Sequence, residues 1–491
     1  MKKINKIISL GLILTATLTS CSHDWLNLDP SDGLPIDGAI SSYQDAFTAL
    51  NGVYDGLQED ERYYGARMLY YGDVRADDMQ STSTATRTLP YYRMQYTATD
   101  VSGIWETPYN IIRRANTLIT ALESGTITDG KKESLDNILG QALAIRALAH
   151  FDLSRVYGKP YQMDNGASWA APIVTNVPSF DSQPLRNTVA EVYTQVIADL
   201  KKSISLMTTD KSIGYFNQYG AQALLSRVYL YQGDNQNAFD AAEAVINSQA
   251  YKLWTNEEYV SAWTKGGNSE LIFEIVNKGN DDWVDRESIG YLMAEDGYGD
   301  LVLTQSFVNE LNSDPKDVRI GLTLAAVESD NIKIYGENKV YVNKFPGRSD
   351  FQPNDVRVNN VPVLRLSEIY LNAAEAAFKL GKLAEAVKYL NAIALRANPD
   401  FTAYTESTIT LDAILEQRAK ELFGEGHRFF DLMRNNKEII RYTSEANIGW
   451  HLPLVKESQS FNNTYFRTIL PVPVTEIDAN PAIGSQQNPG Y

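Results

Sequence analysis

Two stretches of the sequence concentrate aromatic, charged and amide side chains that could bind a polar ligand. The first stretch, residues 62–103, contains Arg75, Asp77, Arg87, Tyr91, Tyr92, Arg93 and Tyr96. The second stretch, residues 277–300, contains Asn280, Trp283, Arg286 and Tyr291. Neither stretch shows a clear hydrophobic period, so we expect two long loops, and long loops in folded domains often carry binding residues.

The residue types in these stretches fit the chemistry of a sugar. A pyranose ring has an apolar face that stacks on Trp or Tyr, and its hydroxyls need planar donors and acceptors such as Arg, Asn and Asp. Trp283 is the strongest single candidate, because it stands in the polar segment Asn280-Asp-Asp-Trp-Val-Asp-Arg286. The alternative is that many of these loop aromatics pack against their own loops. Trp105 and Tyr109, four residues apart on an expected helix, are predicted to be core residues.

The sequence offers no visible catalytic or metal-binding set. The motifs of nucleophile elbows, phosphate-binding loops and dinucleotide-binding turns are absent, and the four histidines do not have the spacing of metal ligands. His150 lies among alanines and leucines and is predicted to be a hydrogen-bonded core residue. We therefore expect no catalytic residue, no cofactor and no metal site, although a structural calcium ion stays open.

Carboxylates provide the remaining catalytic alternatives. A glycosidase needs two carboxylates about 5–10 Å apart, and the adjacent acids Asp77-Asp78 and Asp281-Asp282 are candidates, although adjacent acids more commonly mark solvated turns. A second alternative makes Glu421 and Glu425 an acid and base pair. The favoured interpretation of that segment is an ion-pair lattice, because its charges recur at the i, i+3 spacing of helix neighbours: Arg418 to Glu421, Glu425 to Arg428, Arg428 to Asp431 and Asp431 to Arg434.

Composition narrows the class of protein. The chain has 491 residues, of which 44% are hydrophobic and 11% aromatic, which is enough for a packed core. Its formal net charge of -17 argues against a nucleic-acid partner, because phosphate binding needs a basic surface.

The first residues have the pattern of a lipoprotein signal peptide. Lys2, Lys3 and Lys6 precede an apolar run over residues 7–18, and Leu18-Thr-Ser-Cys21 matches a bacterial lipobox. We expect cleavage after residue 20 and acylation of Cys21, the single cysteine of the chain. Removal of residues 1–20, which carry three lysines and no acid, would change the net charge from -17 to about -20.

The residues between the loops predict a helical scaffold. Residues 361–397 describe two amphipathic helices around Gly381, and residues 219–246 repeat this arrangement around Gly233. Further helices are expected over 43–57, 104–122, 135–157, 188–200 and 411–434, the fourth opened by a Thr188 to Glu191 capping box. Short strands are expected over 271–276 and 332–345, and an extended tail over 469–491. The predicted fold is mostly α: a tetratricopeptide-like helical-repeat scaffold with long loops and a few short strands, in a single compact body.

Several segments resemble one protein family. Arg365-Leu-Ser-Glu-Ile-Tyr-Leu-Asn-Ala-Ala-Glu-Ala376 resembles the signature helix of the SusD-like (RagB/SusD) family of outer-membrane nutrient-binding lipoproteins. Residues 25–30, 186–200, 411–434 and 469–491 also resemble family segments, although the family usually has glutamate where Gln417 stands. The resemblance implies a lipid-anchored protein facing the extracellular side. It implies that the two loops together hold a glycan, which passes to a SusC-like TonB-dependent outer-membrane transporter without catalysis.

These inferences give a domain plan and two alternatives. We expect a signal peptide over 1–20, a lipidated tether over 21–40, an N-terminal half with the first ligand loop over 41–260, and a C-terminal half with the second ligand loop, the signature hairpin and the tail over 261–491. One alternative is a peptide-binding member of the same family. The less favoured alternative is an all-α glycoside hydrolase.

Overall fold

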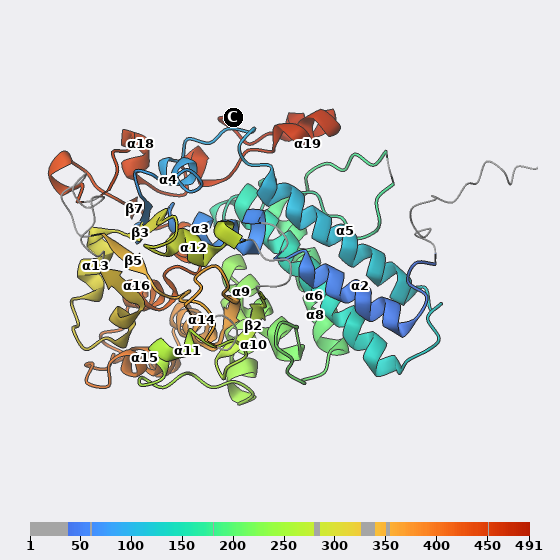
Figure 1. Cartoon of the computed structure of the whole chain (residues 1–491), viewed down its shortest axis with the longest axis horizontal. Coiled ribbons are helices and arrows are strands. Elements are labelled where there is room, and N and C mark those ends of the chain that lie inside the picture. The colour runs from blue at the N-terminus through green and yellow to red at the C-terminus, as the bar shows by residue number, and fades with distance from the viewer. Residues whose placement is uncertain are drawn as a thin grey trace, which may run out of the picture.

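The structure, a computed structural model, describes residues 38–58, 61–179, 181–278, 285–325, 339–349, 354–449 and 451–491. The predicted mostly helical fold is confirmed. In Figure 1, α2, α5, α6 and α8 lie at the right, α9 and α10 at the centre, and α14, α15 and α16 at the left. The scaffold helices are α2 (Tyr43–Asp55), α5 (Gly103–Glu123), α6 (Lys132–Tyr157), α8 (Val189–Leu206), α9 (Gln218–Gln232), α10 (Asn235–Asn247), α14 (Leu366–Lys379), α15 (Leu383–Ala397) and α16 (Leu411–Leu422).

Both predicted helical hairpins form and pack against each other. The chain turns at Gly233 between α9 and α10 and at Gly381 between α14 and α15, with φ of 86° and 74°. These angles lie in the left-handed region that glycine adopts without strain. Helix α10 packs on α14, and a buried ion pair joins α9 to α14, with Arg227 Nε 2.6 Å from Glu368 Oε1. The hairpins thus bury each other's apolar faces, as repeat architectures require.

Helix α8 begins with the predicted capping box. The Thr188 hydroxyl accepts a hydrogen bond from the Glu191 amide at 3.2 Å, and the Glu191 carboxylate accepts one from the Thr188 amide at 2.7 Å. On the adjacent α6, His150 is buried as predicted, with Nδ1 3.0 Å from the Arg146 carbonyl and Nε2 accepting from the Val174 amide at 3.1 Å. Burial lowers the pKa of His150 to about 4, so its ring is neutral at pH 7.

Strands form small antiparallel pairs outside the helical scaffold. The predicted strand over 271–276 is confirmed, whereas of the one expected over 332–345 only residues 340–342 are strand and residues 332–338 lie outside the described ranges. The pairs are β1 (Met79–Ser81) with β3 (Leu301–Leu303), β2 (Leu271–Ile275) with β6 (Val361–Arg365), β4 (Thr323–Ala325) with β5 (Val340–Val342), and β7 (Ile439–Ile440) with β8 (Ser460–Phe461).

Short helices replace much of the predicted loop and tail. Residues 62–103 form a succession of short elements. Their tyrosines pack into the core, and no single hydrophobic spacing continues through so many turns. The tail over 469–491 also contains helical turns. The short helices are η2 (Glu61–Gly65), α3 (Arg67–Asp73), α4 (Leu89–Arg93), α7 (Tyr161–Asp164), α11 (Tyr259–Ala262), η3 (Asp285–Glu287), α12 (Ile289–Met293), α13 (Gln305–Leu311), η4 (Val318–Leu322), α17 (Arg428–Arg434), η6 (Glu445–Asn447), α18 (Lys456–Gln459), η7 (Phe466–Thr468), α19 (Val474–Ala479) and η8 (Pro481–Gln486).

The charged segment 411–434 breaks into α16 and α17, and its charges form a buried lattice between elements. Arg365 at the end of β6 contacts Glu270 at 2.6 Å, Glu421 at 3.1 Å and Glu425 at 2.8 Å. These three carboxylates are buried among cations, so the acid and base interpretation of Glu421 and Glu425 is wrong and the lattice interpretation is correct.

The partners within this lattice differ from the predicted ones. Of the four predicted i, i+3 pairs, the structure records Asp431 with Arg434 at 2.7 Å. Arg418 instead contacts Asp431 at 2.8 Å, because the break between α16 and α17 turns the two helices toward each other. Gln417 accepts a hydrogen bond from Arg319 at 3.0 Å, so the amide keeps a place in the lattice.

Candidate functional site

The pairing of β1 with β3 brings the two candidate ligand stretches together. Ser81 pairs with Leu301, and just beyond the strands the Thr82 amide donates to the Asp300 carbonyl at 2.9 Å. The Thr82 hydroxyl donates to the Gly299 carbonyl at 3.0 Å. Residues more than two hundred positions apart therefore meet on one surface. We call this surface the loop junction and define it by Thr82, Arg87, Glu287, Tyr298 and Asp300.

The loop junction presents an aromatic ring beside a charged pair. The guanidinium of Arg87 lies 3.9 Å above the centre of the Tyr298 ring and contacts both carboxylate oxygens of Glu287. Tyr298 is 38% exposed, and Tyr291 packs edge-on against it with ring centres 4.9 Å apart. The stacked guanidinium and the Tyr291 edge hold the Tyr298 ring in place, so its conformational entropy loss on ligand binding is small.

The same contacts set the charge state of the loop junction. The hydrogen bonds from Arg87 to Glu287 raise the pKa of the guanidinium above its usual range. Burial raises the pKa of Asp300, and the hydrogen bond from the Arg87 amide opposes that shift. The surface therefore offers donors from Arg87 and acceptors from Glu287 around one ring, and the buried Asp300 supports Arg87 from beneath.

Four of the predicted ligand residues lie beneath this surface rather than on it. Tyr91, Tyr92 and Tyr96 are at most 4% exposed, and Arg75 is fully buried between the rings of Tyr71 and Phe429 at 4.1 and 3.9 Å. These side chains have no open face for a ligand, which corrects the prediction. The physical reason is that the rings of Tyr91 and Tyr92 on α4 and of Tyr96 just after it are part of the hydrophobic core, which also encloses Arg75.

Some of the other predicted residues lie at or near the surface, and the rest lie outside the residues that the structure describes. Asp77 forms an ion pair with Arg428, with Oδ1 to Nε at 2.7 Å, whereas Arg93 and Arg286 are exposed and Tyr291 is partly buried. Asn280, Trp283, the Asp281-Asp282 pair and Cys21 lie outside the described residues. Asp78 is buried and Asp77 is paired with a cation, so the Asp77-Asp78 pair offers no open carboxylates for glycosidase chemistry.

A cavity near the other end of β3 adds polar residues that sequence reasoning did not identify. Its volume is about 530 Å³, and we call it the amide cavity because Gln305, Asn309 and Asn447 line it together with Ser306 and His451. His451 is buried, its Nδ1 lies 2.9 Å from the Tyr92 hydroxyl, and its Nε2 has no partner among the described residues. Burial lowers the pKa of His451 to about 3, so its ring is neutral. The polar loop over residues 443–449, which lines the amide cavity, was the feature of the sequence that could have indicated this cavity.

The fold and these surfaces define a class of protein: a helical-repeat protein with a candidate binding face built by insertions into the scaffold. Among the residues that the structure describes, no group of three or more His, Cys, Asp or Glu side chains is arranged to hold a metal ion. Within the same ranges, none of the helices combines the length and apolar character needed to cross a bilayer. Comparison with known proteins places the chain within this class.

Two family models match nearly all of the chain. Residues 161–491 match the SusD family, and residues 24–230 match a family described as starch-binding and associating with the outer membrane. The chain belongs to the SusD family. Proteins of this family bind ligands and are not catalysts, which confirms the prediction that this chain is not an enzyme.

Individual relatives each match more than 90% of the chain. The SusD-like protein P38 of Formosa agariphila is 25% identical over 92% of this chain and 97% of its own length. A SusD superfamily protein from Bacteroides thetaiotaomicron is 40% identical, with a TM-score of 0.85 over 91% of this chain and 100% of that one. A putative sugar binding protein from Bacteroides vulgatus is also 40% identical, with a TM-score of 0.84 over 92% of this chain and 99% of that one.

Proposed function

We propose that this chain binds an oligosaccharide or polysaccharide at the loop junction and passes it to a SusC-like TonB-dependent transporter. The protein would be anchored by lipid on Cys21 to the outer membrane, on its extracellular side. One observation carries the binding proposal: the β1 and β3 pairing assembles an exposed Tyr298 ring, the Arg87 guanidinium and the Glu287 carboxylate on one surface. A ring flanked by planar donors and acceptors suits the apolar face and the hydroxyls of a sugar.

Relatives support a carbohydrate as the ligand class. Two solved proteins of the same fold are described as a laminarin-binding SusD-like protein and as a surface glycan-binding protein from Bacteroides thetaiotaomicron in complex with laminarihexaose. They are 24% and 20% identical to this chain, so they support the class of ligand and leave the sugar open. The exposed Arg93 and Arg286, together with Asn280, Trp283 and Tyr291, complete the set of side chains that we propose for the site.

A binding experiment tests the proposal. Soluble protein comprising residues 22–491 would be titrated calorimetrically with laminarihexaose, maltohexaose, cellohexaose and xylohexaose. For a sugar that binds, we expect Arg87→Ala and Tyr298→Ala each to weaken binding about fivefold, because each loses a stacking or charged contact of about 1 kcal/mol. Trp283→Ala tests the remaining candidate ring, and the exposed Lys316→Ala is the control. Binding that is unchanged in Arg87→Ala and Tyr298→Ala would contradict the site.

The transport step needs a separate measurement. Detergent-solubilised outer membranes of cells that express the tagged, full-length protein would be purified on the tag. We expect a TonB-dependent transporter to co-purify in a fixed ratio. Purification of the protein without a transporter would contradict the hand-off while leaving the binding proposal intact. A peptide-binding role, the alternative within the family, predicts binding of unstructured peptides and of none of the four hexasaccharides.

A further inference from the structure

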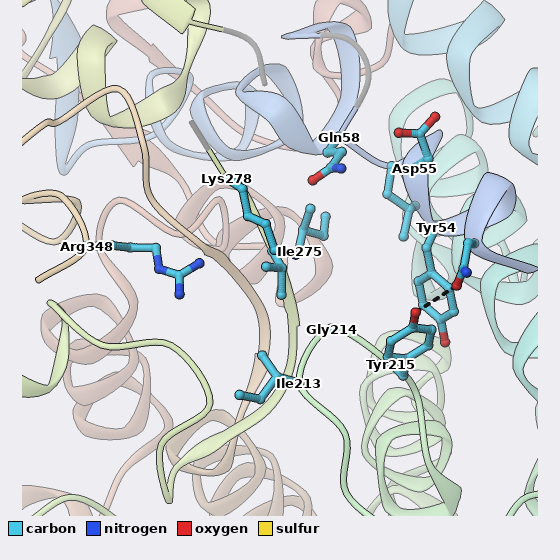
Figure 2. A pocket seen from close by; sticks show the side chains of 12 residues that line it. Tyr54, Asp55, Gln58, Ile213, Gly214, Tyr215, Ile275, Lys278 and Arg348 are labelled. Carbon is cyan, nitrogen blue, oxygen red and sulfur yellow. Dashed lines mark hydrogen bonds between the residues drawn. The ribbon is translucent and has the colours of Figure 1, made fainter. Parts of the chain in front are cut away.

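A larger cavity lies apart from the loop junction and the amide cavity and shares no lining residue with them. Its volume is about 770 Å³, and Figure 2 shows it between the end of α2, residues 213–215 and the segment that follows β2. Cavities of this size commonly hold small-molecule ligands. The side chains that matter for its chemistry are Tyr54, Asp55, Gln58, Tyr215, Lys278 and Arg348.

One wall of the cavity is aromatic and held rigidly. The rings of Tyr54 and Tyr215 meet edge-on with centres 4.9 Å apart. The Tyr54 hydroxyl donates to Gln141 at 2.7 Å and accepts from the Phe216 amide at 2.8 Å, and the Tyr215 hydroxyl donates to Asn51 at 2.7 Å. Because these bonds fix both rings, the wall is preorganised for an apolar ligand face.

The polar groups of the cavity divide into acceptors and donors. The carbonyl oxygen of Gln58 is buried and has no donor among the described residues, and the Asp55 carboxylate follows Tyr54 on the same helix. On the side of β2, Lys278 is exposed, and Arg348 donates to Asn360 at 3.0 Å and to the Asn277 carbonyl at 3.2 Å. Figure 2 shows Gln58 and Lys278 extending from opposite elements toward the shared space.

This arrangement selects a ligand that both donates and accepts hydrogen bonds. The Asp55 carboxylate is paired with Arg114 at 3.4 Å and remains a hydrogen-bond acceptor, whereas a cation would meet Lys278 and Arg348. A buried carbonyl oxygen such as that of Gln58 costs free energy unless a donor reaches it, and a hydroxyl supplies that donor. Sugar hydroxyls fulfil both roles, and a sugar ring has the apolar face that the tyrosine wall accepts.

We propose that this cavity is a second carbohydrate site, which takes the end or a short stretch of a glycan. The choice of ligand class rests on the proposed function. Two sites on one chain would bind a long polysaccharide more tightly than either site alone, because occupancy of one raises the effective concentration of the glycan at the other.

The experiment compares variants of the two sites with the same probes. Saturation-transfer NMR and calorimetry would use residues 22–491 with the four hexasaccharides named above and with glucose, galactose, mannose and xylose. Lys278→Ala and Tyr215→Ala change the cavity, and Arg87→Ala with Tyr298→Ala changes the loop junction. Lys278 is exposed, so its variant keeps the test valid if Tyr215→Ala fails to fold. Lys316→Ala is the control.

Each outcome decides one of the two proposals. We expect a cavity variant to lose at least tenfold in affinity for a probe, or one of two binding equivalents, while the loop-junction variant retains that binding. Loss of affinity in the loop-junction variant alone would overturn the second site and leave the proposed function intact. Loss of affinity in the cavity variants alone would support the second site and overturn the loop junction as a binding site. If none of the probes binds, both proposals are overturned.

Discussion

Asp78 shows how strongly a single buried group can couple to pH. It is 1% exposed, and neither carboxyl oxygen has a hydrogen-bond partner among the described residues. Burial, with a contribution from the charge of Asp77, raises the pKa of Asp78 to about 8. Its unfolded pKa is about 3.9, so between roughly pH 4 and 8 the folded state holds a proton that the unfolded state has released.

This linkage predicts that folding stability decreases as pH rises through that window. The wild-type free energy of unfolding should fall relative to that of Asp78→Asn by up to about 1.4 kcal/mol per pH unit, because asparagine does not titrate. Urea unfolding at pH 5, 6, 7 and 8 measures the difference, with the exposed Asp181→Asn as control. Parallel pH profiles of wild type and Asp78→Asn would show that Asp78 ionises without penalty in the fold.

For single residues, the sequence could indicate which side chains have the chemistry to bind a sugar, but it could not indicate which of them are exposed. Arg286 and Tyr291 were identified and do lie at or near the surface, whereas Tyr91 and Tyr92 were identified by the same criterion and are core residues. The criterion was residue type in an aperiodic stretch, and short helices also lack a period long enough to detect. Whether a ring is stacked by a sugar or by Arg75 depends on packing from distant parts of the chain.

At the scale of elements, the buried lattice around Arg365 ties β6 to α16. Arg365 is 1% exposed and contacts Glu270, Glu421 and Glu425, which would be left without this cation in Arg365→Met. We expect a loss of about 3 kcal/mol in the free energy of unfolding, because three buried carboxylates lose this cation and keep only their contacts with Arg396 or Lys344. Chemical denaturation measures it.

A solvent-exposed ion pair provides the matched control for the lattice. Lys316 and Asp400 are 2.6 Å apart with side chains 68% and 70% exposed, so Lys316→Met should cost less than about 1 kcal/mol. Similar losses for Arg365→Met and Lys316→Met would contradict the structural role given to the lattice.

The contact between α3 and the turn after α16 depends on two glycines. A Cβ at Gly72 would overlap the backbone carbonyl of Gly426, whereas a Cβ at Gly52 in α2 meets nothing within 4 Å. Gly72→Ala should therefore force the elements apart and cost at least about 2 kcal/mol, and Gly52→Ala should stabilise its helix by about 0.5–1 kcal/mol. Thermal unfolding of both variants measures the contrast, and an unchanged Tm for Gly72→Ala would contradict the close approach.

Elements with a long period were the part of the fold that sequence could predict. Both hairpins, the capping box at Thr188 and the strand over 271–275 follow from local spacing and capping chemistry. The break between α16 and α17 was missed, although Gly424 and Gly426 mark it with φ of 76° and 81°. A continuous run of charges concealed the two glycines, because ion-pair spacing alone does not require an unbroken helix.

At the scale of the whole molecule, the candidate site depends on non-local pairing that spacing cannot reveal. Met79 pairs with Leu303, and this register places Arg87 beside Glu287 and Tyr298. The resemblance to a family implied that the two stretches share a face, but the partners came from the fold. The cavity between α2 and β2 had no sequence signal, because it joins four segments that are each unremarkable in composition.

The proposed location of the molecule depends on one residue, Cys21. The apolar run over residues 7–18 would span about 18 Å as a helix, which is shorter than the roughly 30 Å hydrocarbon core, so acyl chains on Cys21 would supply the stable anchor.

We expect Cys21→Ser to abolish labelling with radioactive palmitate and to remove the protein from the outer-membrane fraction. Ser22→Ala keeps the cysteine and should leave both measurements unchanged. Because the proposed sugar-binding surfaces lie in the scaffold and its insertions, protein comprising residues 22–491 should bind glycan with the affinity of the lipidated form. Palmitate labelling that persists in Cys21→Ser would place the anchor elsewhere, and a change in glycan affinity would show that the tether contributes to the site.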